Sequence, residues 1–534
     1  MGRMNALLVL YAGSLSPQAA EPLTQGKNSL TLALERARQF PGIGKIVALA
    51  GQQGENSPAL EGIQVEKRDS WTVKGLLEAI AAHSEGFDLT YFVWADCPFL
   101  DPALAGKLAD RHLRFAAEYS YADGWPYGLA PELLSPGTAA ILAKIMGDND
   151  GPVGRDALFS VIQKDINAFD IETEISPVDL RCHRLTLCAD SKRNLLLLKR
   201  MTECNTGAIP DAAAVERMIA EKREILRTLP AFYPVQVYGG CPQSCAWCPW
   251  PQASGGAVTE RRDYMEARDF ESLLEKIIAF SGDAVIDLSL WGELALHPQK
   301  MNLIESVLRK SELALIIETS GIGWKSDELE RSAELARQAA SVSRKSPLPP
   351  LSWIVSLDAA DPARYKEIRG AGFAEADECA KKLLSLFPRD SYVQAVRTAG
   401  VENDIERFYR TWKEAAAASL EAAASKESGI AANVIIQKYD DFCGALPKKQ
   451  ASDLSPVVRQ PCWHLMRDMP VLIDGTVPLC REQIAANSGL TLGNALTEPL
   501  DSIWERGQRL YIEQTAAQYH ALCAGCDEYY TYNF

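Results

Sequence analysis

Three cysteines within a single short loop constrain this chain more than any other feature of its sequence. Cys241, Cys245 and Cys248 have the spacing C-x3-C-x2-C, which gathers three thiolates around one small volume. Such a loop suits three irons of a [4Fe–4S] cluster and leaves the fourth iron without a protein ligand. A zinc site needs a fourth ligand, and the next cysteine or histidine along the chain is His297. The spacing therefore favours an iron–sulfur cluster with an open iron over structural zinc.

The loop, with Trp247 just before its last cysteine, resembles the radical S-adenosylmethionine (SAM) superfamily. In that superfamily the open iron chelates SAM, and an electron from the cluster cleaves the sulfonium to give a 5′-deoxyadenosyl radical that abstracts hydrogen. The resemblance implies SAM as a cofactor, a reductant such as flavodoxin or ferredoxin as a partner, and a place for Trp247 near the adenine. It leaves the substrate and the residues that act on it unknown.

Further segments resemble the cofactor-binding motifs of this superfamily, and they occur in the expected order. The segment 289–293 resembles the Gly-Gly-Glu motif, with Trp291 in place of the first glycine. The resemblance implies that Glu293 accepts a hydrogen bond from the amino group of SAM. The segments 318–321 and 356–358 resemble those that flank its ribose and carboxylate. The cofactor-binding residues implied in this way are Trp247, Gly292, Glu293, Thr319, Ser320, Ser356 and Asp358.

Apolar, β-branched runs alternate with helical patterns across the middle of the chain, which predicts βα units and a parallel sheet. The motif residues fall at the carboxyl ends of the predicted strands, where β/α barrels place their active sites. Six strands instead of eight predict a partial barrel. The expected strands are Tyr233–Tyr238, Ala284–Trp291, Leu313–Thr319, Ser352–Asp358, Ser391–Arg397 and Ala431–Gln437.

A second set of cysteines lies near the C-terminus: Cys462, Cys480, Cys523 and Cys526. Four thiolates with no open position suit either an auxiliary [4Fe–4S] cluster or a structural zinc. The G-x4-C element that ends at Cys480 resembles the SPASM auxiliary-cluster domain of radical enzymes, which favours iron–sulfur. The full SPASM pattern holds two clusters, whereas four cysteines permit one.

The other six cysteines show no ligand spacing among themselves, and packing is their expected role because cysteine behaves as a small buried hydrophobe. Cys443 follows the sixth predicted strand, so it could lie near the site, but packing is favoured for it too. The six are Cys97, Cys182, Cys188, Cys204, Cys379 and Cys443.

The first two hundred residues predict a different unit, an open α/β sheet. The segments 21–27, 96–101 and 183–190 resemble nucleotidyltransferases that include the acylneuraminate cytidylyltransferases. The resemblance implies that Asp96 binds a divalent metal, and oxygen ligands suit Mg²⁺. The phosphate loop of that family is expected after the first strand, where Gly13 is the one glycine of the segment 12–17 and Pro17 closes it. Because few backbone amides can close on a triphosphate there, a domain that binds or scaffolds is favoured over one that transfers.

Length and composition set the outer bounds. A chain of 534 residues is too long for one ordinary domain. The expected divisions are a nucleotidyltransferase-like domain (1–205), a helical linker (206–231), a partial radical SAM barrel (232–455) and a SPASM-like domain (456–534). A net charge of −15 without a basic tract argues against nucleic acid or an anionic membrane as a partner. No apolar run is long enough for a signal peptide or a spanning helix, so a reducing cytoplasm is expected.

The whole order of segments resembles the family called spiro-SPASM proteins. The resulting hypothesis is a radical SAM enzyme with one auxiliary metal site, acting on a peptide, a protein or a nucleotide-linked sugar. Two alternatives stay open: a non-catalytic iron–sulfur or zinc scaffold whose N-terminal domain binds a nucleotide, and an active cytidylyltransferase at the N-terminus.

Overall fold

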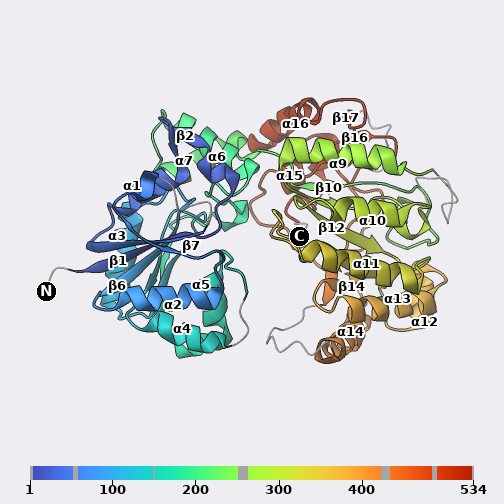
Figure 1. Ribbon diagram of the computed structural model, residues 1–534. Helices are drawn as coiled ribbons and strands as arrows, with labels where there is room; N and C mark the ends of the chain where they lie inside the picture. Colours follow the sequence, from blue (N-terminus) through green and yellow to red (C-terminus); the bar gives the residue numbers. More distant parts are fainter. Residues whose placement is uncertain are drawn as a thin grey trace. The chain divides into compact units, whose positions relative to one another are not determined.

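The computed structural model describes residues 4–51, 58–147, 151–250, 263–422, 433–483 and 490–531. The chain divides into two compact units, Met1–Thr228 and Leu229–Phe534 (Figure 1). Each unit has its own hydrophobic core. Among the described residues, no helix combines the length and the apolar character that crossing a bilayer requires.

A seven-stranded mixed sheet forms the first unit, in the order β5-β4-β1-β6-β8-β7-β9. Its central strands are parallel and fully buried, because helices cover both faces of such a sheet. The strands are β1 (Ala6–Ala12), β4 (Ile43–Ala50), β5 (Gln64–Lys67), β6 (Leu89–Trp94), β7 (Tyr119–Asp123), β8 (Glu132–Leu134) and β9 (Ile171–Ile175), with a small hairpin of β2 (Pro22–Thr24) and β3 (Lys27–Asn28). The helices are α1 (Ser29–Ala37), α2 (Val73–Ser84), α3 (Pro102–Arg114), α4 (Thr138–Met146), α5 (Ala157–Ile162), α6 (Lys192–Cys204) and α7 (Ala212–Glu221). The predicted open α/β sheet is confirmed.

A six-stranded parallel sheet, in the order β10-β11-β12-β13-β14-β15, curls into the partial barrel of the second unit. Its strands are β10 (Phe232–Pro234), β11 (Ala284–Asp287), β12 (Leu313–Thr319), β13 (Leu351–Ser356), β14 (Ser391–Arg397) and β15 (Val434–Lys438). Its helices are α9 (Ala267–Ser281), α10 (Lys300–Leu308), α11 (Ser326–Ala340), α12 (Pro362–Arg369), α13 (Phe373–Leu386) and α14 (Glu402–Ala422). The predicted partial barrel is confirmed.

Alternation along these strands separates the two faces of the sheet, because successive side chains point to opposite sides. Ile286, Leu315 and Trp353 pack with the helices in the large core of the unit. Their neighbours Val285 and Ile316 belong to a small apolar cluster on the other face. Few apolar residues therefore cover the inner face of the sheet. The polar side chains gather beyond the carboxyl ends of the strands.

The first two predicted strands end three or more residues earlier in the structure than the sequence suggested, and the fourth ends at Ser356 instead of Asp358. β10 ends at Pro234, after which Gln236 N donates to Val471 O at 2.8 Å, so the chain leaves the sheet and pairs with the C-terminal region. β11 ends at Asp287, and residues 288–291 form a loop. The apolar residues that made these predicted strands too long pack within loops instead. In the sixth predicted strand, residues 431 and 432 lie outside the described residues.

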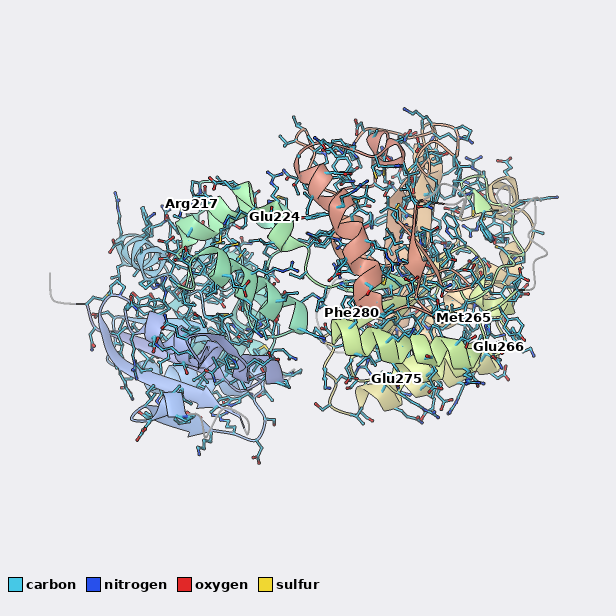
Figure 2. The ribbon with its side chains drawn as sticks, turned by 90° about the horizontal axis from the view of Figure 1, so that it is seen from above. Arg217, Glu224, Met265, Glu266, Glu275 and Phe280 are labelled. Atoms are coloured by element: carbon cyan, nitrogen blue, oxygen red, sulfur yellow. The ribbon has the colours of Figure 1, made fainter. Side chains whose placement is uncertain are left out.

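The C-terminal region packs onto the barrel unit. It comprises α15 (Trp463–Arg467), the antiparallel pair β16 (Thr476–Pro478) and β17 (Thr491–Asn494), α16 (Leu500–Thr515) and α17 (Ala521–Ala524). Ile503 and Trp504 of α16 belong to the barrel core, and Lys276 of α9 donates to the carbonyl oxygens of Ala495 and Leu496. Figure 2 shows α9, between the labelled Glu266 and Phe280, beside α16. The loop after β16 thereby carries Cys480 close to the barrel.

Candidate active site

The cysteine loop (Cys241–Cys248) follows β10 and is held by the end of α12. The backbone amides of Ser244 and Ala246 donate to the carbonyl oxygens of Arg369 and Ile368, at 3.3 and 2.8 Å. A helix end leaves such carbonyls without intrahelical partners, so the loop satisfies them. The position of the three cysteines is therefore fixed by a helix that lies more than a hundred residues further along the chain.

The side chain of Arg369 adds a buried cation to this attachment. Its guanidinium donates to Gln243 Oε1 at 2.8 Å and to Asp358 Oδ2 at 2.5 Å. Gln243 also donates to Tyr365 Oη at 3.0 Å, and Trp247 Nε1 donates to Asp358 Oδ2 at 3.2 Å. The predicted residues Trp247 and Asp358 are thus brought together through one carboxylate.

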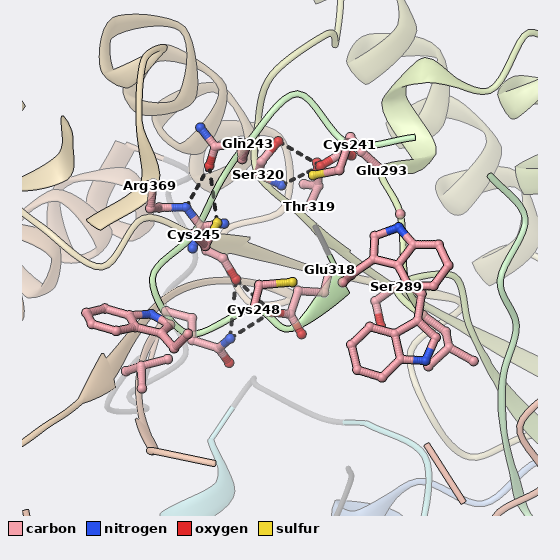
Figure 3. Close-up of a pocket in the computed structure, with 18 of the residues that line it drawn as sticks. Cys241, Gln243, Cys245, Cys248, Ser289, Glu293, Glu318, Thr319, Ser320 and Arg369 are labelled. Carbon is pink, nitrogen blue, oxygen red and sulfur yellow. Dashed lines mark hydrogen bonds between the residues drawn. The ribbon is translucent and has the colours of Figure 1, made fainter. Parts of the chain in front are cut away.

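The three thiols of the loop line a cavity of about 220 Å³ at the carboxyl ends of the strands, here called the barrel cavity. Figure 3 shows Cys241, Cys245 and Cys248 around this space with Glu293, Glu318 and Arg369. Burial raises the pKa of all three thiols, that of Cys248 to about 12, while the Arg369 guanidinium opposes the rise at Cys245. Buried thiols at such a site ionise when a metal binds them, which fits a metal-binding role.

Glu293 organises the predicted residues Thr319 and Ser320. Its Oε1 accepts from Thr319 Oγ1 at 2.7 Å and from Ala295 N at 3.1 Å, and its Oε2 accepts from the amide and hydroxyl of Ser320, each at 2.7 Å (Figure 3). Burial raises the pKa of Glu293, and these hydrogen bonds oppose the rise. Both carboxylate oxygens therefore have partners within the chain, and an ammonium ligand would share them with Ser320.

Ser356 belongs to a separate network across three neighbouring strands. Its Oγ donates to Glu318 Oε1 at 2.6 Å, and Gln394 Nε2 donates to the same oxygen at 2.8 Å. Glu318, Ser356 and Gln394 come from β12, β13 and β14 and line the barrel cavity. The strands thus present one carboxylate, fixed in orientation, toward the cavity.

Gly292 lies where the backbone of two loops meets. A Cβ atom there would stand 1.8 Å from Tyr238 O, so no larger residue fits without moving backbone. The preceding Trp291 has φ of 45°, a left-handed conformation that is uncommon for a tryptophan. Its ring lines the barrel cavity and stacks on Trp250, and its buried Nε1 has no hydrogen-bond partner among the described residues. A tight backbone cradle and an unsatisfied donor both fit a polar ligand in this cavity.

Asp287 is a buried carboxyl in the barrel cavity that the sequence analysis did not single out. It ends β11 and accepts a hydrogen bond from Ser289 Oγ at 2.5 Å. Burial raises its pKa to about 7, against the opposing effect of the Arg481 charge. This side chain can therefore hold or release a proton near neutral pH.

The predicted C-terminal cysteines also meet in one place. Cys462, Cys480, Cys523 and Cys526 line a second cavity, here called the auxiliary cavity. Cys443 lines the same cavity and hydrogen-bonds Cys526, so the packing role expected for it does not fully describe its position. The sequence signal was weak, because Cys443 stands 19 residues before Cys462 and has no ligand spacing.

Two chain segments separate the barrel cavity from the auxiliary cavity. Phe442 lines the barrel cavity and Cys443 the auxiliary cavity; Arg481 lines the former, and Cys480 with Glu482 lines the latter. Adjacent residues are about 3.8 Å apart at their Cα atoms. At these two places the wall between the cavities is therefore one residue thick.

The spacing of the thiols separates clusters from single ions. Sulfur atoms bound tetrahedrally to one zinc ion lie about 3.8 Å apart, whereas the irons of a cluster spread their thiolates further. In the part of the chain that the structure describes, Asp96–Cys97–Cys188 and Asp440–Asp527–Glu528 are the groups with three potential ligand atoms within 4.8 Å of one another. Neither cysteine set is among them. Among the described residues, neither set therefore brings three of its ligand atoms within 4.8 Å of one another in the chain without metal.

In the first unit, the carboxylate of Asp96 forms an ion pair with the side chain of Arg155. Arg155 donates to Oδ1 at 2.9 Å and to Oδ2 at 2.5 Å, and also to Asp190 at 3.2 Å. The guanidinium lies over the Trp94 ring, 4.5 Å from its centroid. Cys97 and Cys188 are buried beside this pair with their Sγ atoms 2.9 Å apart. Arg155 thereby covers the oxygens that a divalent metal would bind.

Several site residues escaped the sequence analysis, for different reasons. Glu318 lies inside a segment that carried the resemblance, and Arg369 follows Asp358 by 11 residues, so proximity to motif residues was a usable signal for both. Gln243 lies within the cysteine loop itself. No local sequence pattern marks Gln394, Arg155 or Asp287. Tertiary folding alone brings Gln394 and Asp287 to the barrel cavity, and Arg155 to Asp96 in the first unit.

Comparison with known proteins found one matching family model and several similar solved structures. The SPASM model, described as an iron–sulfur cluster-binding domain, matches residues 462–527. Similar solved structures include SuiB of Streptococcus suis bound to precursor peptide SuiA (13% identity, 66% of this chain and 76% of that chain, TM-score 0.39). Another is a cytidylyltransferase of Leptospira borgpetersenii (15% identity, 42% of this chain and 96% of that chain, TM-score 0.35).

The chain thus has the partial barrel, the cysteine loop and a C-terminal match to an iron–sulfur cluster-binding domain, the three features that the resemblance to radical SAM proteins predicted. An uncharacterized protein of Treponema pallidum (strain Nichols) is 36% identical over 384 residues, which span 71% of this chain and 98% of that protein. The chain belongs to the same family as this Treponema protein.

Proposed function

We propose that the chain is an enzyme that cleaves SAM reductively at a [4Fe–4S] cluster bound by Cys241, Cys245 and Cys248. The observation that carries the proposal is the set of three half-buried thiols that line one cavity at the carboxyl ends of the strands. A non-catalytic zinc scaffold would not need this open cavity. With SAM bound, such a cluster supplies a 5′-deoxyadenosyl radical on one-electron reduction, which starts hydrogen abstraction from a substrate.

The residues of the chain divide the work of binding. Arg369 and Gln243 hold the cysteine loop, and the Arg369 charge stabilises a neighbouring thiolate. Trp247 and Asp358 are assigned to SAM, as are Gly292, Glu293, Thr319, Ser320 and Ser356, all of which line the barrel cavity. Glu293 orients Thr319 and Ser320, and Gly292 lets backbone approach the ligand closely.

Proton transfer can be assigned to Asp287. It lines the barrel cavity, and burial raises its pKa to about 7, so it can accept a proton from a substrate at neutral pH. Ser289 orients the carboxyl through the 2.5 Å hydrogen bond. The aromatic rings of Trp250, Trp291 and Phe442 form an apolar wall of the same site that limits access of water.

We further propose an auxiliary [4Fe–4S] cluster at Cys462, Cys480, Cys523 and Cys526. The match to an iron–sulfur cluster-binding domain supports a cluster over zinc. Because one residue separates the cavities at two places, a substrate in the barrel cavity would lie within reach of electron exchange with that cluster. A peptide, a protein or a nucleotide-linked sugar is the proposed substrate, and flavodoxin or ferredoxin the proposed reductant.

The test is SAM cleavage by the full chain, reconstituted with iron and sulfide without oxygen and reduced with dithionite. We expect 5′-deoxyadenosine from the wild type and none from Cys245→Ala, with a loss of about four irons per chain. Cys182→Ala, at an exposed cysteine of the first unit, is the matched control and should retain both. Wild-type protein with intact clusters and no 5′-deoxyadenosine would favour the scaffold instead.

A further inference from the structure

Five thiols line the auxiliary cavity, one more than a four-iron cluster binds. The SPASM match at residues 462–527 includes four of them and leaves Cys443 outside. Each iron of a [4Fe–4S] cluster takes one cysteine thiolate, so four thiols complete the cluster. One of the five must therefore stand beside the cluster without an iron of its own.

The chain around Cys443 is shaped so that this residue faces the auxiliary cavity. Phe442, Cys443 and Gly444 have successive φ values of 51°, 56° and 86°, and the first two are unfavourable for side chains. Two carboxylates fix the turn: Asp440 accepts from the amide of Phe442 at 2.7 Å, and Asp441 accepts from the amide of Gly444 at 2.9 Å. With this backbone, Phe442 lines the barrel cavity while Cys443 lines the auxiliary cavity.

Within the auxiliary cavity, Cys443 contacts one of the four other thiols directly. Its side chain hydrogen-bonds that of Cys526, so the two sulfur atoms occupy neighbouring positions. Cys462 and Cys523 have a different neighbour in Gln514, which accepts from the amide of Cys462 at 2.9 Å and hydrogen-bonds the Cys523 side chain. Cys443 is thus placed to reach the iron that Cys526 binds.

We propose that Cys443 and Cys526 are alternative ligands of one iron in the auxiliary cluster. This inference rests on the proposed auxiliary cluster and is independent of SAM cleavage. In the exchange, the iron–sulfur bond to Cys526 breaks and one to Cys443 forms. The proton of the Cys443 thiol passes to Cys526, so no electron is gained or lost. The unbound thiol donates a hydrogen bond to the bound thiolate in either arrangement.

The first experiment measures iron in the full chain carrying Cys241→Ala, Cys245→Ala and Cys248→Ala, in which iron reports on the auxiliary cluster alone. We expect about four irons per chain in this background, and the same number after adding either Cys443→Ala or Cys526→Ala. Adding both leaves three thiols, as does Cys523→Ala, which has no substitute thiol, so these two variants should lose iron to the same extent. Paramagnetic resonance of the reduced cluster should shift in Cys526→Ala, because the ligand has changed.

The inference fails if Cys526→Ala loses as much iron as Cys523→Ala, or if the variant without Cys443 and Cys526 keeps more iron than Cys523→Ala. A background that binds no iron would overturn the auxiliary cluster and this inference together, whereas 5′-deoxyadenosine from the wild type tests the proposed function separately.

A second measurement needs no variant. Brief alkylation of the wild-type holoprotein with iodoacetamide, followed by peptide mass spectrometry, should label Cys443 and Cys526 in fractions that add up to one. Label confined to Cys443 would show that Cys526 alone holds the iron and would overturn the exchange.

Discussion

The first unit and the barrel unit both place polar side chains beyond the carboxyl ends of parallel strands. In the first unit these side chains form an ion pair with each other, whereas in the barrel unit they surround a cavity. In the first unit, Asp96 follows β6 and is paired in a bidentate manner with Arg155. In the barrel unit, the thiols that follow β10 line an open cavity. One position is complete within the chain, and the other has room for a metal group.

Aromatic packing shows the same difference. Tyr11, Trp71 and Trp94 fill the region around Gly13, with the Tyr11 and Trp94 ring centroids 4.8 Å apart. In the barrel unit, the Trp250 and Trp291 rings form one wall of a cavity instead of filling it. The comparison teaches that a guanidinium and a few aromatic rings are sufficient to close a site whose strand topology suits a ligand.

The largest expected difference comes from adding one methyl group to a glycine of each unit. In Gly292→Ala the new Cβ would meet the backbone oxygen of Tyr238 at 1.8 Å, and backbone cannot move aside without displacing the cysteine loop. We expect complete loss of 5′-deoxyadenosine formation. In Gly13→Ala the nearest atoms are those of the Trp71 and Tyr11 side chains, at 2.5 and 2.6 Å.

Gly13→Ala should destabilise the first unit by about 1–3 kcal/mol through overpacking and leave SAM cleavage intact. Product formation and urea unfolding distinguish the two variants. Equal activity of both would show that Gly292 does not border the SAM site.

The next largest effect is expected at Arg155. Arg155→Ala leaves Asp96 buried without its cation, which should lower the free energy of unfolding by about 3–5 kcal/mol. Arg181→Ala, which breaks an exposed pair with Asp179, is the matched control and should leave the free energy of unfolding nearly unchanged. Mg²⁺ should raise the Tm of Arg155→Ala, because Asp96 and Asp190 are released, but not that of the wild type. A wild-type response to Mg²⁺ would contradict the closed site.

The smallest effect is a change in pH dependence at Asp287. Its folded pKa of about 7 lies above the unfolded value of about 3.9, so the folded state holds this proton more tightly. The stabilisation is complete below about pH 4 and is lost as the pH rises through 7. Relative to Asp287→Asn, the wild type should therefore lose stability between about pH 4 and pH 7, with a slope of up to about 1.4 kcal/mol per pH unit.

Urea unfolding at several pH values measures this, and Asp269→Asn, at an exposed position of α9, should show no such trend. Parallel curves for wild type and Asp287→Asn would mean that Asp287 is not a neutral acid in the fold.

Sequence patterns predicted the sheet of each unit because local periodicity determines which face of a strand is buried. β12 and β14 have the predicted bounds, since their apolar runs end where the strands do. β10 is shorter than predicted, because Gln236 pairs with Val471 from the C-terminal region, a partner that no local pattern reveals.

The candidate site also combines features that local sequence patterns predict with features that depend on long-range contacts. Motif spacing predicted that Cys241, Cys245 and Cys248 would meet, and the chain folds them onto one cavity. Arg155 on Asp96 and Cys443 beside Cys526 depend on contacts between residues 59 and 83 positions apart in sequence, so neither could be read from spacing. The assignment of individual residues to SAM stays a prediction.

The single-residue thickness of the partition at 442–443 and 480–481 also constrains how this family can vary. Side chains on neighbouring positions face opposite chambers, so inserting or deleting one residue there would exchange an aromatic or an arginine for a metal-binding sulfur. A change in length there alters both chambers at once, whereas a substitution alters one. Relatives that keep both metal centres should therefore share the same residue count between β15 and Cys443, however far their sequences have drifted.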